Sequence, residues 1–248
     1  MINPTESHST LCSTGSFTEF RKEAIEQSIP TVFERQVEQN TNRPAVITDG
    51  GTLTYDDLNR IANRIANTIL ERCGEGQEPV AIILANDVTA IAGIFGILKA
   101  GKICVPVDAS VPTARAISII TDSQARVIVT GRNHLAMAQA SGLTTHEIIN
   151  LNEVRPKIAD HNPSVSIAPT DLAHIIYTSG STSEPKGVID VHRNVLHHVM
   201  VVTNSSHYCR EDRMTLVRAP SSTGGLANVY SALLNGACLF PFDVQTKG

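Results

Sequence analysis

Short apolar runs alternate with helix-like segments along most of this sequence, and one run constrains the fold more than any other feature. Residues 79–84 read Pro-Val-Ala-Ile-Ile-Leu and are apolar at every position. A strand is apolar on both faces where helices cover both faces of its sheet, as they do around a central parallel strand. This run therefore predicts a parallel sheet with a helical layer on each side.

The segment before this run has the pattern of an amphipathic helix. Thr54 can cap its first turn, and Asp57 stands three residues later, where its carboxylate can complete a capping box. Apolar residues then recur at helical spacing, at Leu58, Ile61, Ala62, Ile65, Ala66, Ile69 and Leu70. The face that they form is expected to pack against another element.

The alternation continues along the chain. Gly101 is placed to end a helix over residues 88–100, and Pro112 suits the first turn of the next helix. Further helices are expected near 134–140, from about 193 and over 226–234, and strands over 103–107, 126–130, 146–151, 174–178, 187–191, 214–218 and 237–240. This order is typical of an α/β fold with a doubly wound, mainly parallel sheet flanked by helices.

Composition and charge exclude several classes of function. The balance of 20 Lys+Arg against 24 Asp+Glu, without a basic stripe, makes nucleic acid an unexpected partner. The longest apolar stretch, near residues 90–98, is shorter than a membrane-spanning helix, and no secretory signal opens the chain. We therefore expect a cytoplasmic protein without a membrane partner, in which residues 1–18 form a flexible tail.

Cysteines and histidines give no sign of a metal centre. The five cysteines are scattered and include no Cys-x-x-Cys pair, so we expect them to be reduced. His192, His197 and His198 lack the spacing of four residues that places two imidazoles on one helical face. The sequence therefore predicts no metal site built from these side chains.

Residues 177–188 carry the strongest chemical signal. They read Tyr-Thr-Ser-Gly-Ser-Thr-Ser-Glu-Pro-Lys-Gly-Val, a loop rich in hydroxyls and glycine that ends in a lysine. Backbone N–H groups, hydroxyls and the Lys186 ammonium are donors suited to phosphate oxygens. An ordinary surface loop has a similar composition. The loop is not a Gly-x-x-x-x-Gly-Lys-Ser/Thr phosphate loop, because Pro185 stands in place of its second glycine and Gly187 in place of its hydroxyl.

This loop closely resembles the signature of the acyl-adenylate-forming enzymes, which include adenylation domains of nonribosomal peptide synthetases, acyl-CoA synthetases and luciferases. It departs from the specified positions only at Ser183, where the family usually has glycine. Weaker resemblances lie at 53–64, at 98–108, at His192 and at 233–237. The resemblance implies that residues 19–248 are a partial adenylation domain, the first half of the large N-terminal lobe.

The resemblance also implies roles for particular residues. The implied phosphate-binding residues are Thr178, Ser179, Gly180, Ser181, Thr182, Lys186 and Gly187. Among them, Lys186 and Thr182 are the implied catalytic residues. The implied lining of the acyl pocket is Thr223, Gly224 and Ala227.

One position bears on the substrate. Amino-acid-activating members of the family hold the α-ammonium of the substrate with an aspartate. This aspartate lies roughly a dozen residues before a Leu-Leu-Asn-Gly block, which is residues 233–236 here, and Thr223 stands at its position in this chain. A hydroxyl does not offset the cost of burying an ammonium. We expect a carboxylic acid without an α-amino group. A shifted alignment, or a carboxylate supplied from elsewhere, remains an alternative.

The implied activity is that of an AMP-forming ligase. ATP with Mg²⁺ activates a carboxylic acid as acyl-AMP, pyrophosphate leaves, and a thiol of coenzyme A or of a carrier protein's phosphopantetheine receives the acyl group. The family's adenine, ribose and magnesium motifs are expected beyond Gly248, so this chain alone is expected to be inactive. A non-catalytic binding module that keeps the fold is the alternative.

Overall fold

The computed structural model describes residues 16–85, 87–142, 147–154, 158–178 and 186–242. The strands are β1 (Pro44–Thr48), β2 (Gly51–Thr54), β3 (Pro79–Leu84), β4 (Ile103–Asp108), β5 (Val127–Thr130), β6 (Glu147–Asn150), β7 (Leu172–Thr178), β8 (Lys186–Val191), β9 (Arg213–Leu216) and β10 (Cys238–Pro241). The α-helices are α1 (Ile29–Asn40), α2 (Tyr55–Cys73), α3 (Val88–Lys99), α4 (Thr113–Asp122), α5 (Leu135–Gln139), α6 (His192–Ser206) and α7 (Thr223–Leu233). The short 3-10 helices are η1 (Lys22–Glu26), η2 (Arg132–His134) and η3 (Leu151–Glu153).

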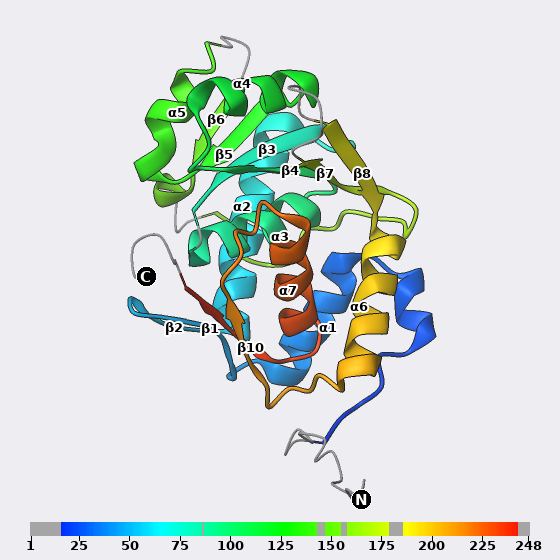
Figure 1. Cartoon of the computed structure of the whole chain (residues 1–248). Helices are drawn as coiled ribbons and strands as arrows, with labels where there is room; N and C mark the ends of the chain where they lie inside the picture. The colour runs from blue at the N-terminus through cyan, green and yellow to red at the C-terminus, as the bar shows by residue number, and fades with distance from the viewer. Residues whose placement is uncertain (1–15, 86, 143–146, 155–157, 179–185, 243–248) are drawn as a thin grey trace, which may run out of the picture.

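The strands form two sheets rather than one (Figure 1). The six-stranded sheet has the order β6-β5-β3-β4-β7-β8 and is parallel except for the antiparallel β7–β8 hairpin. The smaller sheet has the order β2-β1-β10-β9 and contains β1 and β2, which the sequence analysis did not predict. The mainly parallel α/β class is confirmed, and its strands are divided between two sheets.

Strand β3 confirms the two-sided burial that its sequence predicts. Val80 and Ile82 face the core cluster formed with α2 and α3, whereas Ala81 and Ile83 face the cluster formed with α4. All four side chains are at most 2% exposed. Helices therefore cover both faces of the sheet at its centre.

The predicted caps are present. Thr54 Oγ1 accepts the Asp57 N–H at 3.1 Å, and Asp57 Oδ2 accepts the Thr54 N–H at 3.0 Å, which completes the capping box of α2. Gly101 follows α3 with a φ of +69°, the left-handed conformation that favours glycine. Local sequence signals thus set the start of α2 and the end of α3.

Helix α3 lies at the centre of the molecule and is buried along its length from Ala90 to Lys99. Its Phe95 ring stacks on Phe33 of α1, with centroids 4.1 Å apart, and meets Tyr230 of α7 edge-on at 5.9 Å. These contacts join helices that lie far apart in the sequence into one core.

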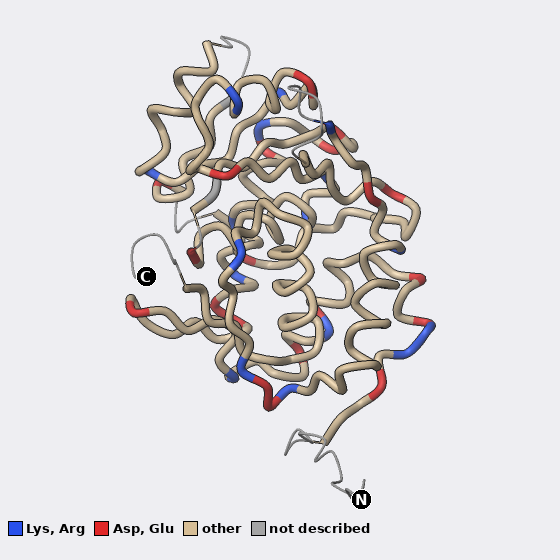
Figure 2. The backbone as a smooth tube through the Cα atoms, in the orientation of Figure 1, with Lys and Arg blue, Asp and Glu red and all other residues tan. Residues whose placement is uncertain are grey.

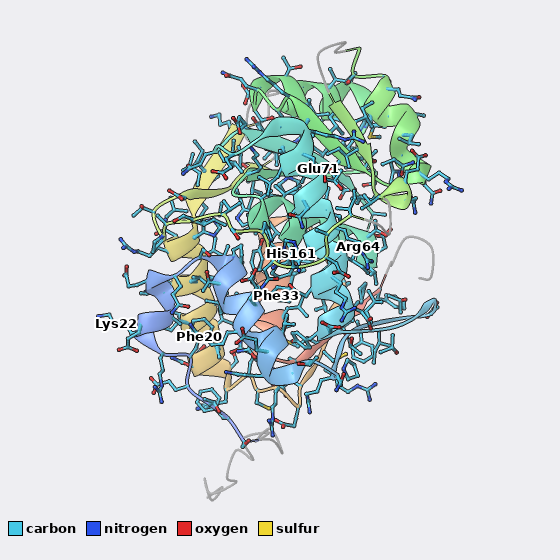
Figure 3. All side chains as sticks on the ribbon, turned by 180° about the vertical axis from the view of Figure 1, so that it is seen from behind. Phe20, Lys22, Phe33, Arg64, Glu71 and His161 are labelled. Carbon is cyan, nitrogen blue, oxygen red and sulfur yellow. The ribbon has the colours of Figure 1, made fainter. Side chains whose placement is uncertain are left out.

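The connection before β7 is fixed by polar contacts. Asn63 Nδ2 of α2 donates to Asp160 O and to Asn162 Oδ1, and Arg64 pairs with Asp160 at 3.0 Å. Figure 3 shows the segment that carries His161 crossing in front of α2 when the molecule is seen from behind. This irregular segment is therefore anchored to the helix that it crosses.

Charged residues of both signs are interspersed along the chain (Figure 2). Of the expected N-terminal tail, residues 1–15 lie outside the described ranges. Phe17 places its ring edge-on to His207, with centroids 4.8 Å apart. No disulfide joins any two of the four cysteines that the structure describes.

Close packing of α2 against α3 predicts that Gly96→Ala destabilises the protein. A Cβ on Gly96 would lie 2.6 Å from Ile65 Cγ2 and 3.0 Å from the Ala62 carbonyl oxygen, so the two helices would have to separate. We expect the free energy of unfolding to fall by about 1–3 kcal/mol, measured by urea denaturation. In the control Gly50→Ala, the nearest atom to the new Cβ is Thr48 Oγ1 at 3.6 Å. Equal stability of the two variants would contradict this account of the packing.

Candidate functional site

The β7–β8 hairpin positions the ends of the candidate phosphate loop. In its register Thr178 pairs with Lys186, Ile176 with Val188, and His174 with Asp190. Side chains at alternate positions of a strand share a face, and paired residues share it across the hairpin. One face of the hairpin therefore carries, in order from the loop, the pairs Thr178/Lys186, Ile176/Val188 and His174/Asp190.

The loop itself falls largely outside the described residues. Ser179, Gly180, Ser181 and Thr182 lie there, so their geometry is not described. Thr178 and Lys186 are described, and both side chains are exposed. By the register, both residues lie on the hairpin face that also carries His174 and Asp190.

Gly187 follows the loop where little space is available. A Cβ there would lie 2.9 Å from Ile175 Cγ2 and 3.2 Å from Tyr177 Cζ. Tyr177 is held in place because its hydroxyl donates to Asp122 Oδ2 at 2.5 Å. Desolvation and the neighbouring carboxylate raise the pKa of this phenol, so it stays protonated as a donor.

Helix α7 brings the candidate acyl-binding residues to the hairpin. It begins at Thr223, three residues earlier than the sequence predicts, because Ser222 Oγ caps it by accepting the Gly225 N–H at 3.1 Å. Gly225 is required for this turn, since a Cβ there would lie 2.0 Å from the Ala219 carbonyl oxygen. Gly224 and Gly225 thus belong to the first turn of α7.

A pocket of about 200 Å³ lies between the hairpin, α6 and α7. Its lining residues are His174, Ile176, Asp190, Val195, His198, Val199, Thr223, Leu226, Ala227 and Tyr230. Thr223 and Ala227 of the implied acyl pocket line it, whereas Gly224 does not and instead lies beside Arg218. Five of the ten lining residues are aliphatic and the other five carry a polar group, and small-molecule sites usually combine an apolar wall with polar groups.

Among the lining residues that were not predicted from the sequence are His174, Tyr230 and Asp190. His174 Nε2 and the Tyr230 hydroxyl form a buried hydrogen bond of 2.6 Å. Alternation along the hairpin could have placed His174 and Asp190 on one face. The contact with Tyr230 lies 56 residues away along the chain, and no local pattern indicates it.

Two buried histidines near the pocket are neutral. Burial, with a smaller effect of His192, lowers the pKa of His174 to about 3. Burial also lowers the pKa of His192 to about 4, despite the nearby Asp171 carboxylate. His192 Nδ1 accepts the Ile29 N–H at 3.2 Å and so holds the start of α1. His192 therefore links α6 to α1.

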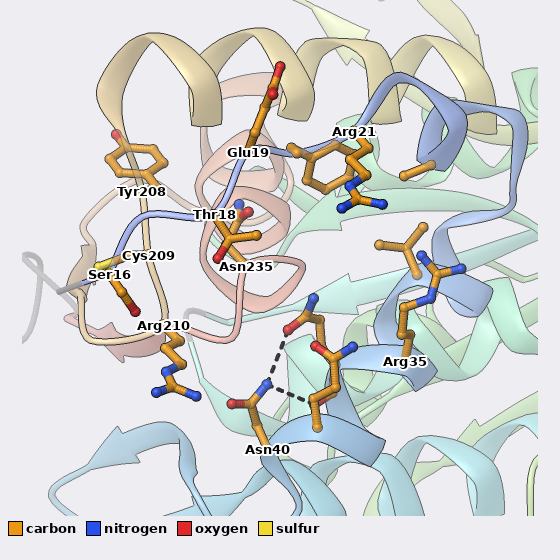
Figure 4. Close-up of a pocket in the computed structure, with 15 residues that line it drawn as sticks. Ser16, Thr18, Glu19, Arg21, Arg35, Asn40, Tyr208, Cys209, Arg210 and Asn235 are labelled. Atoms are coloured by element: carbon orange, nitrogen blue, oxygen red, sulfur yellow. Dashed lines mark hydrogen bonds between the residues drawn. The ribbon is translucent and has the colours of Figure 1, made fainter.

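A larger cavity of about 480 Å³ lies elsewhere (Figure 4). Arg21 and Arg35 lie on one side of it and Arg210 on the other. Its lining comes from the N-terminal segment, α1 and residues near 208–210 and 235, with no contribution from β7 or β8. This cavity is therefore separate from the candidate site.

Within the described ranges, no group of three or more His, Cys, Asp or Glu side chains is arranged to hold a metal ion. None of the helices in those ranges is both long enough and apolar enough to cross a bilayer.

Comparison with known proteins gives a consistent result. The profile of the family described as AMP-binding enzyme matches residues 33–247. The chain is 35% identical to surfactin synthase subunit 2 of Bacillus subtilis over 88% of its own length and 6% of that protein. It is 32% identical to tyrocidine synthase 1 of Brevibacillus parabrevis over 89% of its own length and 20% of that protein.

A solved structure shows the same arrangement. The nonribosomal peptide synthetase FmoA3 superposes with a TM-score of 0.80 and 26% identity, over 88% of this chain and 23% of that one. Crystal structures of FmoA3 include forms with AMPPNP and with alpha-methyl-L-serine-AMP bound. This chain thus spans a minor part of each of these proteins.

The two neutral histidines predict a loss of stability in mild acid. An unfolded histidine has a pKa of about 6.5, so below that pH the unfolded state binds more protons than the native state and stability falls as pH drops towards 4. At pH 5 each histidine costs on the order of 2 kcal/mol relative to pH 7. His192→Asn, which keeps an acceptor for Ile29, should reduce the difference between pH 7 and pH 5 in urea denaturation.

The matched control is His161→Asn, because His161 is exposed on the connection before β7. The difference between pH 7 and pH 5 should be the same in this variant as in the unaltered protein. An equal reduction in both variants would show that burial of His192 is not the cause.

Proposed function

The chain belongs to the AMP-binding enzyme family, and we propose that it holds the ATP phosphates and the acyl part of a carboxylic acid in an acyl-adenylating ligase. One observation carries the proposal. Thr178 and Lys186 flank the signature loop on the hairpin face that continues into the pocket lined by Thr223 and Ala227. The proposed phosphate donors and the proposed acyl cavity would thus share one surface.

The proposed phosphate cradle is the loop with its two flanking residues. Lys186 provides a compact positive charge, and Thr178, Ser179, Ser181 and Thr182 provide hydroxyl donors. ATP, when bound, supplies the AMP group that activates the carboxylate. The chain's contribution is electrostatic, because preorganised donors offset negative charge that develops on phosphate oxygens. Lys186 and Thr182 are the proposed catalytic residues.

Mg²⁺ is proposed to accompany ATP, with its protein ligands mainly outside this chain. Oxygen ligands from carboxylates are what Mg²⁺ requires in addition to phosphate and water. The described residues hold no cluster of three such side chains. The part of the cradle that the chain does provide, a lysine and several hydroxyls, fits phosphate rather than the metal itself.

We further propose that the acid lacks an α-amino group. Thr223 is the first residue of α7, and the described part of the site places no carboxylate on that turn. A helix N-terminus carries partial positive charge and disfavours a neighbouring ammonium. FmoA3, in contrast, has been crystallised with an amino-acyl adenylate. The difference in the proposed substrate rests on Thr223.

The acceptor in the complete protein is proposed to be the thiol of coenzyme A or of a carrier protein's phosphopantetheine, in the cytoplasm. The chain alone is proposed to be inactive, since adenylation needs groups on both sides of the reacting atoms held in fixed geometry. A binding module without catalytic activity is the second candidate. Acid-dependent ATP–pyrophosphate exchange by the full-length protein distinguishes the two.

Lys186→Ala in the full-length protein should lower acid-dependent ATP–pyrophosphate exchange by about tenfold or more, because it removes a positive charge at the phosphates. The melting temperature should be unchanged, since the side chain is exposed. Lys22→Ala removes an exposed lysine from η1 and serves as the control. Unaltered exchange in Lys186→Ala would remove this lysine from the site.

The substrate proposal is tested with pairs of acids that differ only in the α-amino group. Exchange by the full-length protein should favour the member without the amine. Thr223→Asp should raise kcat/KM for the amino acid relative to its partner, because the new carboxylate can pair with the ammonium. A preference for the amino acid in the unaltered protein would contradict the proposal.

A further inference from the structure

Asp190 is the one carboxylate among the residues that line the pocket, and five of the others are aliphatic. It lies on β8 opposite His174 and faces the cavity between the hairpin, α6 and α7. The neighbouring wall is formed by Ile176, Val195 and Val199. Asp190 is half-buried, so the wall of the pocket takes away part of the water around its carboxylate.

The protein itself provides little to balance this charge. Asp190 Oδ1 accepts the Val191 N–H at 3.0 Å, and this is the one side-chain hydrogen bond of Asp190 within the described residues. No lysine or arginine pairs with Asp190 in those ranges. His174 beside it is neutral and already bonded to Tyr230, and His198 lies exposed at the rim of the cavity. Local capping therefore accounts for one carboxylate oxygen and leaves Oδ2 available.

The position of Asp190 on the hairpin indicates which end of a substrate would meet its carboxylate. Lys186 lies four residues away on the same strand and face, about 13 Å at the usual rise of a strand. Thr223 and Ala227 line the same cavity from α7. An acid whose carboxylate lies near Lys186 would therefore direct the far end of its chain towards Asp190.

We propose that Asp190 is a specificity-determining residue that selects a carboxylic acid with a protonated amine at the end remote from its carboxylate. The proposal rests on the function proposed above. It agrees with the absence of a carboxylate at Thr223, because the ammonium belongs to the far end of the chain rather than to the α-carbon. A charge-assisted hydrogen bond to Oδ2 would then replace the hydration that the pocket removes.

The test compares three series of straight-chain acids of graded length: ω-amino, ω-hydroxy and unsubstituted. ATP–pyrophosphate exchange by the full-length protein should be highest with an ω-amino acid. Asp190→Asn, which keeps the shape and removes the charge, should lower kcat/KM for that acid by about tenfold or more. Activity with the unsubstituted acid of equal length should stay within about twofold, since that acid makes no ionic contact with residue 190.

The control is Glu38→Gln, which removes an exposed carboxylate from α1 and should leave kcat/KM unchanged for both the ω-amino acid and the unsubstituted acid. Ligand-observed NMR on the full-length protein without ATP provides a second readout. Binding of the ω-amino acid that is lost in Asp190→Asn, without exchange activity in either protein, would support the role of Asp190 and refute the adenylation proposal.

Two outcomes would overturn the inference. Exchange that is highest with unsubstituted acids and unaffected by Asp190→Asn would do so while leaving the proposed function intact. Absence of both exchange and binding across the three series would overturn the inference together with the proposed function.

Discussion

The fold depends on the burial of helix α3 on all sides. Apolar residues surround this helix, and its side chains from Ala90 to Lys99 contact other elements rather than water. Gly96 permits close approach of α2, while Phe95 packs between Phe33 and Tyr230. Because a helix that is apolar all round must be enclosed, the six-stranded sheet, α1, α2 and α7 assemble around it.

Two buried lysines at the end of α3 fix the surrounding connections. Lys99 donates to Glu34 of α1 and, at 3.1 Å, to Asn162 of the segment before β7, whereas Lys102 pairs with Glu78 ahead of β3 at 2.5 Å. Desolvation lowers the pKa of Lys99, and the Glu34 carboxylate opposes that shift. A buried ammonium without its partner is strongly unfavourable. Lys99 therefore ties α1 to the segment that leads into the β7–β8 hairpin, whereas Lys102 holds the residue ahead of β3.

The sequence identifies part of this site and misses the rest, for a physical reason. The loop of residues 179–185 has a continuous motif, and Thr223 follows from its distance to the Leu-Leu-Asn-Gly block. Both are local signals. The inner pocket is different, because Asp190, His174 and Tyr230 belong to separate elements and carry no shared pattern. The function proposed for Lys186 can therefore be inferred from a sequence motif. The selectivity proposed for Asp190 can be inferred only from the packing of the hairpin against α6 and α7.

The sequence by itself determined the local structure. Hydrogen bonds within a few residues specify the capping box at Thr54 and the helix end at Gly101, and the apolar run of β3 requires cover on both faces. Tertiary structure alone decided that the strands divide into two sheets and that β1 pairs with β10, some 190 residues later in the chain. It also decided that α7 lies beside the β7–β8 hairpin. Such pairings depend on how whole surfaces pack against one another. Residues that meet only in the folded protein share no pattern along the sequence, so their contact cannot be predicted from it.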